Sequence, residues 1–129
     1  MRRKIIAVTI LAFLAGCTTL HRMPMPAAPK QTLFILFFVP GTTRLAPEAE
    51  AIVRQAAGIA LESKVTKIEI AVPQDTPGGV SLVEGRFTSV QNILSAAHVD
   101  TKLLTRANLA ADAESLPGAT DRAEVRLLP

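Results

Sequence analysis

The sequence predicts a two-layer α/β (α+β) sandwich. Three observations predict it: an uninterrupted apolar run at 33–39, two stretches of helical periodicity at about 47–62 and 82–97, and an alternating apolar pattern at 123–127. With a second alternating segment at 65–72 and a short third strand at 103–109, the order is strand, helix, strand, helix, strand, strand. Helices and strands that follow one another in this order pack as layers around one core.

The first predicted strand consists of seven apolar residues, Leu33 to Val39, and ends at Pro40-Gly41. Such a run is typical of a strand that is buried on both faces, with helices around it. Pro47 opens the first helix, at a position where its missing N–H costs nothing, and the helix should extend to about Glu62. Its apolar stripe consists of Ala49, Ile52, Val53, Ala56 and Ala60.

The next segment, 65–72, alternates between a polar and an apolar side, which predicts a second strand. Two Pro and two Gly make 73–79 a loop. The second helix should span about Leu82 to Ala97, because apolar residues recur there at spacings of three and four. In the final strand, the apolar residues Ala123, Val125 and Leu127 alternate with charged ones.

The N-terminus has the pattern of an export signal. Arg2, Arg3 and Lys4 precede an uncharged, mostly apolar run at 5–15, which is shorter than the roughly 20 residues of a membrane-spanning helix. The run ends in Leu14-Ala15-Gly16-Cys17, which resembles the lipobox of bacterial lipoproteins. The resemblance implies that residues 1–16 are a signal peptide and that Cys17 becomes the lipid-carrying N-terminus. The alternatives are a buried Cys in a short hydrophobic segment and an uncleaved signal anchor.

Lipidation at Cys17 implies a stable attachment to a membrane, since several acyl chains anchor a protein stably whereas a single chain binds reversibly. Thr18 follows the Cys, whereas Asp there is the usual inner-membrane retention signal in enteric bacteria, so the outer membrane is favoured. Residues 17–30 contain Pro24, Pro26 and Pro29 and predict an extended tether. Residues 31–129 then form one domain.

The charge balance and the residue types exclude several function classes. Three of the 14 Lys and Arg residues lie in the predicted signal peptide and none of the 11 Asp and Glu do, so the rest of the chain carries 11 charges of each sign. Nucleic-acid binding needs a surplus of clustered cations, so we do not expect it. No catalytic motif, metal-spaced cluster or cofactor fingerprint is present, so we expect no enzyme and no cofactor.

Several motifs in this order resemble the OmpA-like C-terminal domain family, which includes the peptidoglycan-associated lipoprotein. The resemblance covers roughly residues 33–128 and implies a β-α-β-α-β-β domain with a mixed sheet. The matching segments are Phe38 at the end of the first strand, Leu45-Ala46-Pro47-Glu48-Ala49 at the first helix, Asp75-Thr76-Pro77-Gly78 in the loop, the Leu82, Arg86 and Val90 positions of the second helix, and Arg122-Ala123-Glu124-Val125 in the last strand. The family has Leu-Thr-Pro-Glu-Ala, Asp-x-x-Gly, Leu-Ser-x-x-Arg-Ala-x-x-Val and Arg-Val-Glu-Ile at these places.

The resemblance implies noncovalent binding of the peptidoglycan stem peptide, particularly of diaminopimelate. One end of that residue carries an ammonium and a carboxylate. Asp75 would supply an anion for the first, and Arg86 a fork of donors for the second. Arg122 is a candidate residue at the rim of the site. The expected location is the periplasmic face of the outer membrane, with other envelope proteins as further partners.

Four departures from the family pattern leave a rival open. The loop between Asp75 and Arg86 is shorter, Pro73-Gln74 replaces Gly-His, Val39 replaces an Asp, and Asp121 replaces an Arg. The domain could therefore be a scaffold that contacts another envelope protein and no longer binds the cell wall, or an unrelated α/β domain with the same element order.

Each candidate residue also has a structural alternative. Asp75 could be an ordinary turn residue in its loop. Arg86 could form a structural salt bridge with Glu84, Asp75 or Glu124.

Overall fold

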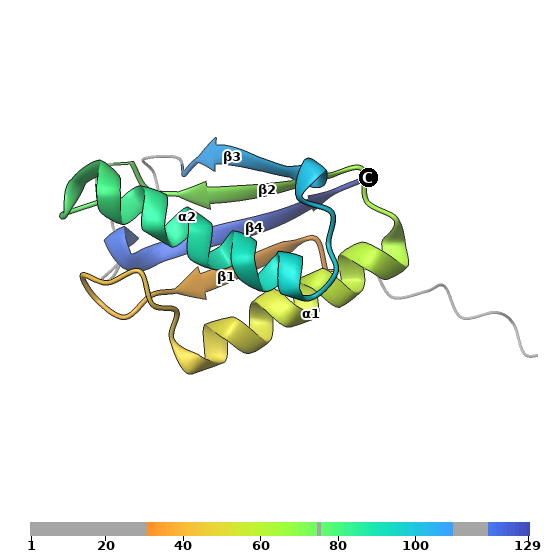
Figure 1. The fold of residues 1–129 in the computed structure, drawn as a ribbon, viewed down its shortest axis with the longest axis horizontal. Coiled ribbons are helices and arrows are strands. Elements are labelled where there is room, and N and C mark those ends of the chain that lie inside the picture. The colour runs from red at the N-terminus through yellow and green to blue at the C-terminus, as the bar shows by residue number, and fades with distance from the viewer. Residues whose placement is uncertain (1–30, 75, 110–118) are drawn as a thin grey trace, which may run out of the picture.

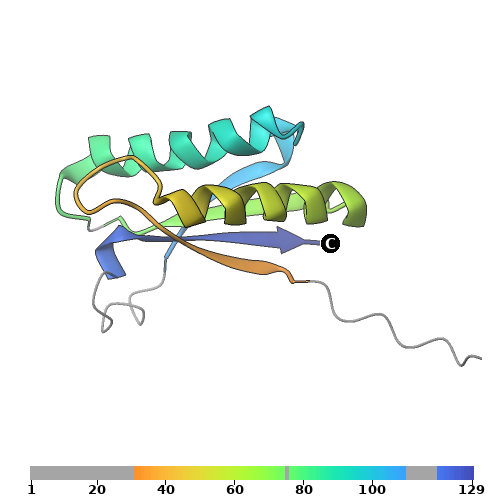
Figure 2. The ribbon, with the colours of Figure 1, turned by 90° about the horizontal axis from the view of Figure 1, so that it is seen from below.

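The computed structural model of the protein describes residues 31–74, 76–109 and 119–129, and these residues form a helical layer packed on a sheet (Figures 1 and 2). The predicted signal peptide, Cys17 and the tether lie outside these residues, and so does Asp75. The elements are β1 (Leu33–Phe37), α1 (Pro47–Ser63), β2 (Lys67–Val72), α2 (Gly79–Ala96), η1 (Thr101–Leu103), β3 (Leu104–Asn108), η3 (Ala119–Asp121) and β4 (Arg122–Leu128). This order and the mixed sheet confirm the predicted fold class.

The last strand of the chain lies in the middle of the sheet. The strand order is β1-β4-β2-β3, with β4 antiparallel to both of its neighbours and β2 parallel to β3. In this register Val125 is opposite Phe34 on one side and Ile70 on the other. Strands β1, β2 and β3 therefore end at the edge of the sheet where β4 begins, as Figure 1 shows at its left.

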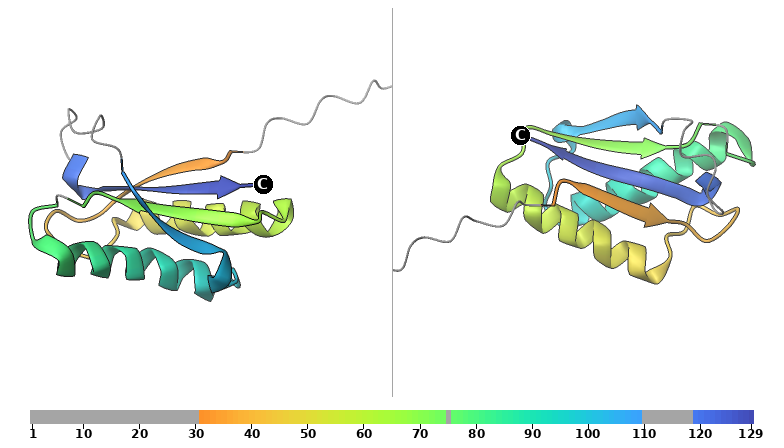
Figure 3. Two further views of the ribbon diagram at one scale, coloured as in Figure 1. Left: turned by 90° about the horizontal axis from the view of Figure 1, so that it is seen from above. Right: turned by 180° about the vertical axis from the view of Figure 1, so that it is seen from behind.

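Strand β1 corrects one prediction. Phe34 and Leu36 are buried under the helices, but Leu33, Ile35 and Phe37 are 42%, 40% and 50% exposed. The expectation of burial on both faces is wrong, because both helices cover the same face of the sheet and β1 is an edge strand (Figure 3). Apolarity alone did not distinguish the two arrangements, since the outward residues of β1 are as apolar as the inward ones.

Helix α1 packs closely on the sheet because its buried face consists of small residues: Ala49, Val53, Ala56, Ala57 and Ala60. Pro47 stands at its first turn, as predicted. The helix ends one residue beyond the predicted Glu62, and Lys64 adopts a left-handed conformation there and donates its N–H to the Ala60 carbonyl. Such a left-handed residue is a common way for a helix to end.

Helix α2 begins three residues before the predicted start, in a turn that needs glycine. Gly78 and Gly79 have φ angles of +117° and +74°, and a Cβ on Gly78 would lie 2.8 Å from Leu82 Cδ2. Side chains rarely adopt such angles, so the two glycines set the point at which the loop becomes a helix. None of the helices in the described ranges is long and apolar enough to cross a membrane.

Candidate functional site

Three segments that are distant in the sequence meet at the edge where β4 begins (Figure 1). They are the loop 38–46 after β1, the loop 73–78 before α2, and the turn η3 that leads into β4. The N-terminal half of α2 lies beside them and contributes Arg86. We refer to Arg86 and the described residues that accept its hydrogen bonds, Thr42, Thr120 and Asp121, as the Arg86 cluster.

The guanidinium of Arg86 is completely buried and is held by its own chain. Its Nε donates to the Thr42 carbonyl at 2.9 Å, Nη1 to the Thr120 carbonyl at 2.7 Å, and Nη2 to Asp121 Oδ1 at 2.6 Å. Its Cζ lies 4.8 Å from the centre of the Phe38 ring. These contacts satisfy three of the five N–H groups of an arginine and join the loop after β1 to η3.

Asp121 supplies the negative charge that a buried arginine requires. Its Oδ1 accepts from both Arg86 Nη2 and the Gly41 N–H, the latter at 3.3 Å, and its side chain is 20% exposed. The backbone of Asp121 is fixed as well, since Phe38 N donates to its carbonyl at 2.8 Å. The sequence comparison treated Asp121 only as a departure from a motif, whereas it is the ion-pair partner of Arg86.

The loop 73–78 reaches the same cluster through Thr76. Thr76 Oγ1 donates to the Pro73 carbonyl at 2.7 Å and approaches the Thr120 carbonyl at 3.4 Å, and Thr76 is buried. The Thr120 carbonyl therefore accepts from Arg86 and lies close to the Thr76 hydroxyl, whose single proton is donated to Pro73. Thr76, which follows Asp75 in the sequence, therefore lies near the same backbone carbonyl as the Arg86 guanidinium. Asp75 itself lies outside the described residues.

The loop after β1 is pressed against α2 where the helix has a glycine. A Cβ on Gly85 would lie 2.4 Å from Thr43 Cγ2, far inside van der Waals contact. Ser89, one turn further, donates to the Thr43 carbonyl at 2.8 Å. These contacts hold the backbone of Thr42 in position to accept from Arg86.

The structure separates Arg122 from the Arg86 cluster. Arg122 is paired with Glu124, and Arg126 Nη2 lies 2.7 Å from the other oxygen of the same carboxylate. In the register of the sheet, Glu124 is opposite Ile35. The side chain of Ile35 is on the helix-free face, so that of Glu124 is there as well. Arg122 therefore follows Asp121 in sequence, but its side chain lies with those of Glu124 and Arg126 on the face of the sheet that the helices do not cover.

Two expected partners of Arg86 are engaged elsewhere. Glu84 pairs with Arg106, whose hydrogen bond holds the pKa of the Glu84 carboxyl below its ordinary value, and Glu124 pairs as described above. The sequence did carry a signal for the burial of Arg86. It stands three residues after Val83 and four before Val90, so it lies on the buried stripe of α2.

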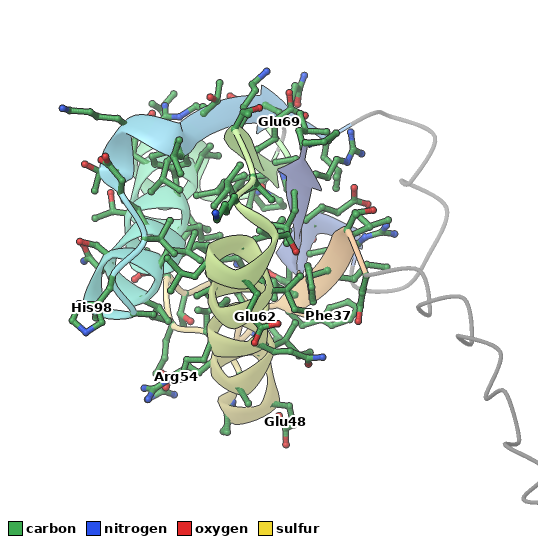
Figure 4. All side chains as sticks on the ribbon, turned by 90° about the vertical axis from the view of Figure 1, so that its right-hand side faces the viewer. Phe37, Glu48, Arg54, Glu62, Glu69 and His98 are labelled. Carbon is green, nitrogen blue, oxygen red and sulfur yellow. The ribbon has the colours of Figure 1, made fainter. Side chains whose placement is uncertain are left out.

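The described residues also form a groove away from the Arg86 cluster. A groove of about 270 Å³ lies between the helices and is lined by Arg54, Asn92, Ile93, Ala96 and Ala97. In Figure 4, Arg54 and His98 are on this helical side, and Phe37 projects from β1 on the other. No three potential metal-ligating side chains come together within 31–74, 76–109 and 119–129.

Comparisons with known proteins identify the fold. No family model matches the chain, and no curated protein matches it. Among solved structures, the OmpA-like domain of FopA1 from Francisella tularensis is similar with a TM-score of 0.60 at 11% identity, over 75% of this chain and 72% of that one. The peptidoglycan-associated lipoprotein from Burkholderia pseudomallei is similar with a TM-score of 0.58 at 17% identity, over 71% and 87%.

The periplasmic domain of Helicobacter pylori MotB is similar as well, with a TM-score of 0.56 at 16% identity, over 77% of this chain and 78% of that one. At these identities the likeness establishes the fold. The chain thus has the α+β fold of OmpA-like domains, with the element order that the sequence predicts.

Proposed function

We propose that this chain is an exported lipoprotein, lipidated at Cys17, whose OmpA-like domain binds peptidoglycan noncovalently and connects the outer membrane to the cell wall. The observation that carries the proposal is the position of the Thr120 carbonyl. It accepts from Arg86 and lies 3.4 Å from the hydroxyl oxygen of Thr76, the neighbour of Asp75, so the two segments that bear the proposed binding residues come close together at this carbonyl. The similarity to a peptidoglycan-associated lipoprotein supports the same class of function.

The chemistry of the proposed site follows from two opposite charges. A diaminopimelate side chain ends in an ammonium and a carboxylate. Asp75 would accept from the ammonium, and the Arg86 guanidinium would donate to the carboxylate. Arg122 is not part of the site in this proposal, because its side chain is paired with Glu124 on the helix-free face of the sheet.

Co-sedimentation of the full chain with purified diaminopimelate-type sacculi tests the binding. We expect the wild-type protein to sediment, free diaminopimelate to compete, and Asp75→Asn to weaken the binding. Glu84→Gln is the matched control, since it removes a carboxylate that is bound to Arg106 rather than placed at the Arg86 cluster. A folded wild-type protein that stays in the supernatant would exclude the proposed function.

Metabolic labelling with palmitate tests the lipid anchor separately. The wild-type chain should incorporate the label and fractionate with the outer membrane, while Cys17→Ser should do neither. Because this is the only Cys in the sequence, the variant removes every possible site of thiol lipidation. Labelling of Cys17→Ser, or an unlabelled wild-type chain, would contradict the assignment of residues 1–16 as a lipoprotein signal peptide.

A second candidate function is supported by one observation. The guanidinium of Arg86 already has a carboxylate partner, Asp121, at 2.6 Å. A domain whose ligand position is filled in this way could serve as a scaffold for another envelope protein. In that case a partner should be captured by cross-linking in cells, equally well by the wild type and by Asp75→Asn, while sacculi bind neither protein.

A further inference from the structure

Asp121 places a carboxylate at the position where the proposed function requires a ligand carboxylate. Its Oδ1 is 2.6 Å from Arg86 Nη2, and the arginine has no exposed surface. We propose that Asp121 is a built-in occupant of the Arg86 guanidinium and that a ligand carboxylate binds there only by displacing it. This inference rests on the proposed function and names the residue that regulates access to its site.

The guanidinium can exchange its carboxylate without losing its position. Nε and Nη1 donate to the backbone carbonyls of Thr42 and Thr120, and neither bond involves a carboxylate. Two directions of the planar group are thus fixed by the main chain. Among the bonds that Arg86 makes to residues 31–74, 76–109 and 119–129, the Nη2 bond alone ends on a side chain, which can rotate away, so Nη2 is the exchangeable donor.

The contact made by Asp121 is weaker than the one a free ligand could make. Within the part of the chain that the structure describes, both hydrogen bonds to its carboxylate end on Oδ1, and the bond from Gly41 N is long at 3.3 Å. A carboxylate that uses both oxygens on a guanidinium binds more strongly than a one-oxygen contact. A ligand carboxylate that uses both oxygens can compete with Asp121 if its second bond offsets the entropy that a free molecule loses on binding.

Asp121 also has a route by which to leave. Its side chain is 20% exposed, whereas that of Arg86 is fully enclosed. The Phe38 N–H holds the Asp121 carbonyl at 2.8 Å, so rotation of the side chain alone opens the guanidinium and leaves the start of β4 in place. The charge balance selects the ligand: an anion can replace Asp121, but a neutral or cationic group would leave the buried arginine uncompensated.

Rescue by acetate tests the occupancy with no need for peptidoglycan. We expect Asp121→Ala to lower the Tm of the full chain by about 10 °C or more, since 1 kcal/mol corresponds to roughly 4–8 °C in a domain of this size. Sodium acetate should restore at least half of the loss, because a ligand that binds only the folded state raises its stability. Acetamide, and sodium chloride at equal ionic strength, should not.

The double variant Arg86→Met/Asp121→Ala is the decisive control. Acetate that raises the Tm of the single variant and leaves the double variant unchanged supports the inference. An equal rise in both variants, or no rise in a folded single variant, overturns it. If Asp121→Ala does not fold, Asp121→Asn takes its place in the same comparison, because its amide oxygen keeps an acceptor near Gly41 N.

Binding to sacculi separates this inference from the proposed function. Removal of the competing charge in Asp121→Asn should tighten binding on the order of tenfold, since the apparent Kd rises as the fraction of open sites falls. Equal or weaker binding than the wild type overturns the inference while the proposed function stands. Binding by Asp121→Asn with none by the wild type supports the occupant and excludes peptidoglycan binding by the native chain.

Discussion

Arg86 and Asp121 are 35 positions apart in the sequence, and their 2.6 Å ion pair closes the end of the sheet where β4 begins. The arginine reaches it from the buried face of a helix, where a charged side chain is stable only if it is neutralised and hydrogen-bonded. Both conditions are met, because two backbone carbonyls complete its contacts. The pair therefore connects α2 to the turn before β4, and it is also part of the proposed binding site.

Replacement of Arg86 by Met should cost about 3–5 kcal/mol of unfolding free energy, the usual cost of breaking a buried ion pair. The change leaves the Asp121 carboxylate and the carbonyls of Thr42 and Thr120 without their donor. Urea unfolding of the full chain, followed by circular dichroism, measures the effect.

Arg106→Met is the matched control for this variant. Arg106 also pairs with a carboxylate, that of Glu84, and also lies over a Phe ring, 4.4 Å from the centre of Phe87. It differs in being exposed, and exposed pairs contribute little. Equal losses from Arg86→Met and Arg106→Met would show that the burial of Arg86 has no energetic consequence.

Gly85→Ala should destabilise the domain by about 1–3 kcal/mol, the cost of overpacking. The new methyl group would lie 2.4 Å from Thr43 Cγ2 and would push the loop away from α2. Thr43→Ser, which removes that methyl group, should recover most of the loss in a double-mutant cycle.

Gly58→Ala provides the contrast in α1. A Cβ at Gly58 meets nothing within 4 Å, so the same substitution should stabilise the protein by about 0.5–1 kcal/mol through helix propensity. If Gly85→Ala is as stabilising as Gly58→Ala, the loop does not press on the helix in solution.

Substitutions at two adjacent residues of β1 should lower the stability of the domain by very different amounts. Leu36 is completely buried, so Leu36→Ala should cost about 2–5 kcal/mol. Ile35 is 40% exposed on the helix-free face, and Ile35→Thr should change stability by no more than about 0.5 kcal/mol. Similar large losses at both positions would mean that a second layer covers the outer face of β1.

The pKa of Glu84 predicts a small effect of pH. The hydrogen bond from Arg106 lowers this pKa below the ordinary value of 4.5. A carboxyl whose pKa is lowered in the folded state stabilises the fold above its unfolded pKa, and this contribution is lost as the pH falls through the folded value.

Titration of the Glu84 carboxyl by NMR measures this effect. The midpoint should lie below 4.5 in the wild type and should rise in Arg106→Met, where the donor is missing. An unchanged midpoint in the variant would show that the ion pair does not persist in solution.

The periodic segments of the sequence were sufficient to predict the fold. Both helices, the alternating strands and their order follow from spacing, because a residue's place on a helix or strand decides which side it faces. The pattern failed at β1, where exposed and buried positions are equally apolar. Whether a strand lies at the centre or the edge depends on pairing with distant segments, which a local pattern does not contain.

The candidate site was predicted less completely. The position of Arg86 on the buried stripe of α2 was available from its spacing to Val83 and Val90, but its partner Asp121 was not. Asp121 reaches it only because the last strand enters the sheet beside β1, a long-range pairing that no motif encodes. The charge of Arg86 marked it as a candidate in the sequence, but the strand order of the sheet determines that it contacts Asp121.

The place of β4 in the sheet also determines when the domain can acquire its shape. Residues 122–128 form the strand between β1 and β2, so the first two strands have no common neighbour until β4 is present. A chain threaded through an export channel from its N-terminus could not complete this sheet until residues 122–128 emerge, and such distant pairings slow folding. A truncation that removes residues 122–128 should therefore prevent the whole domain from folding, because β1 and β2 would lose the strand that pairs with both.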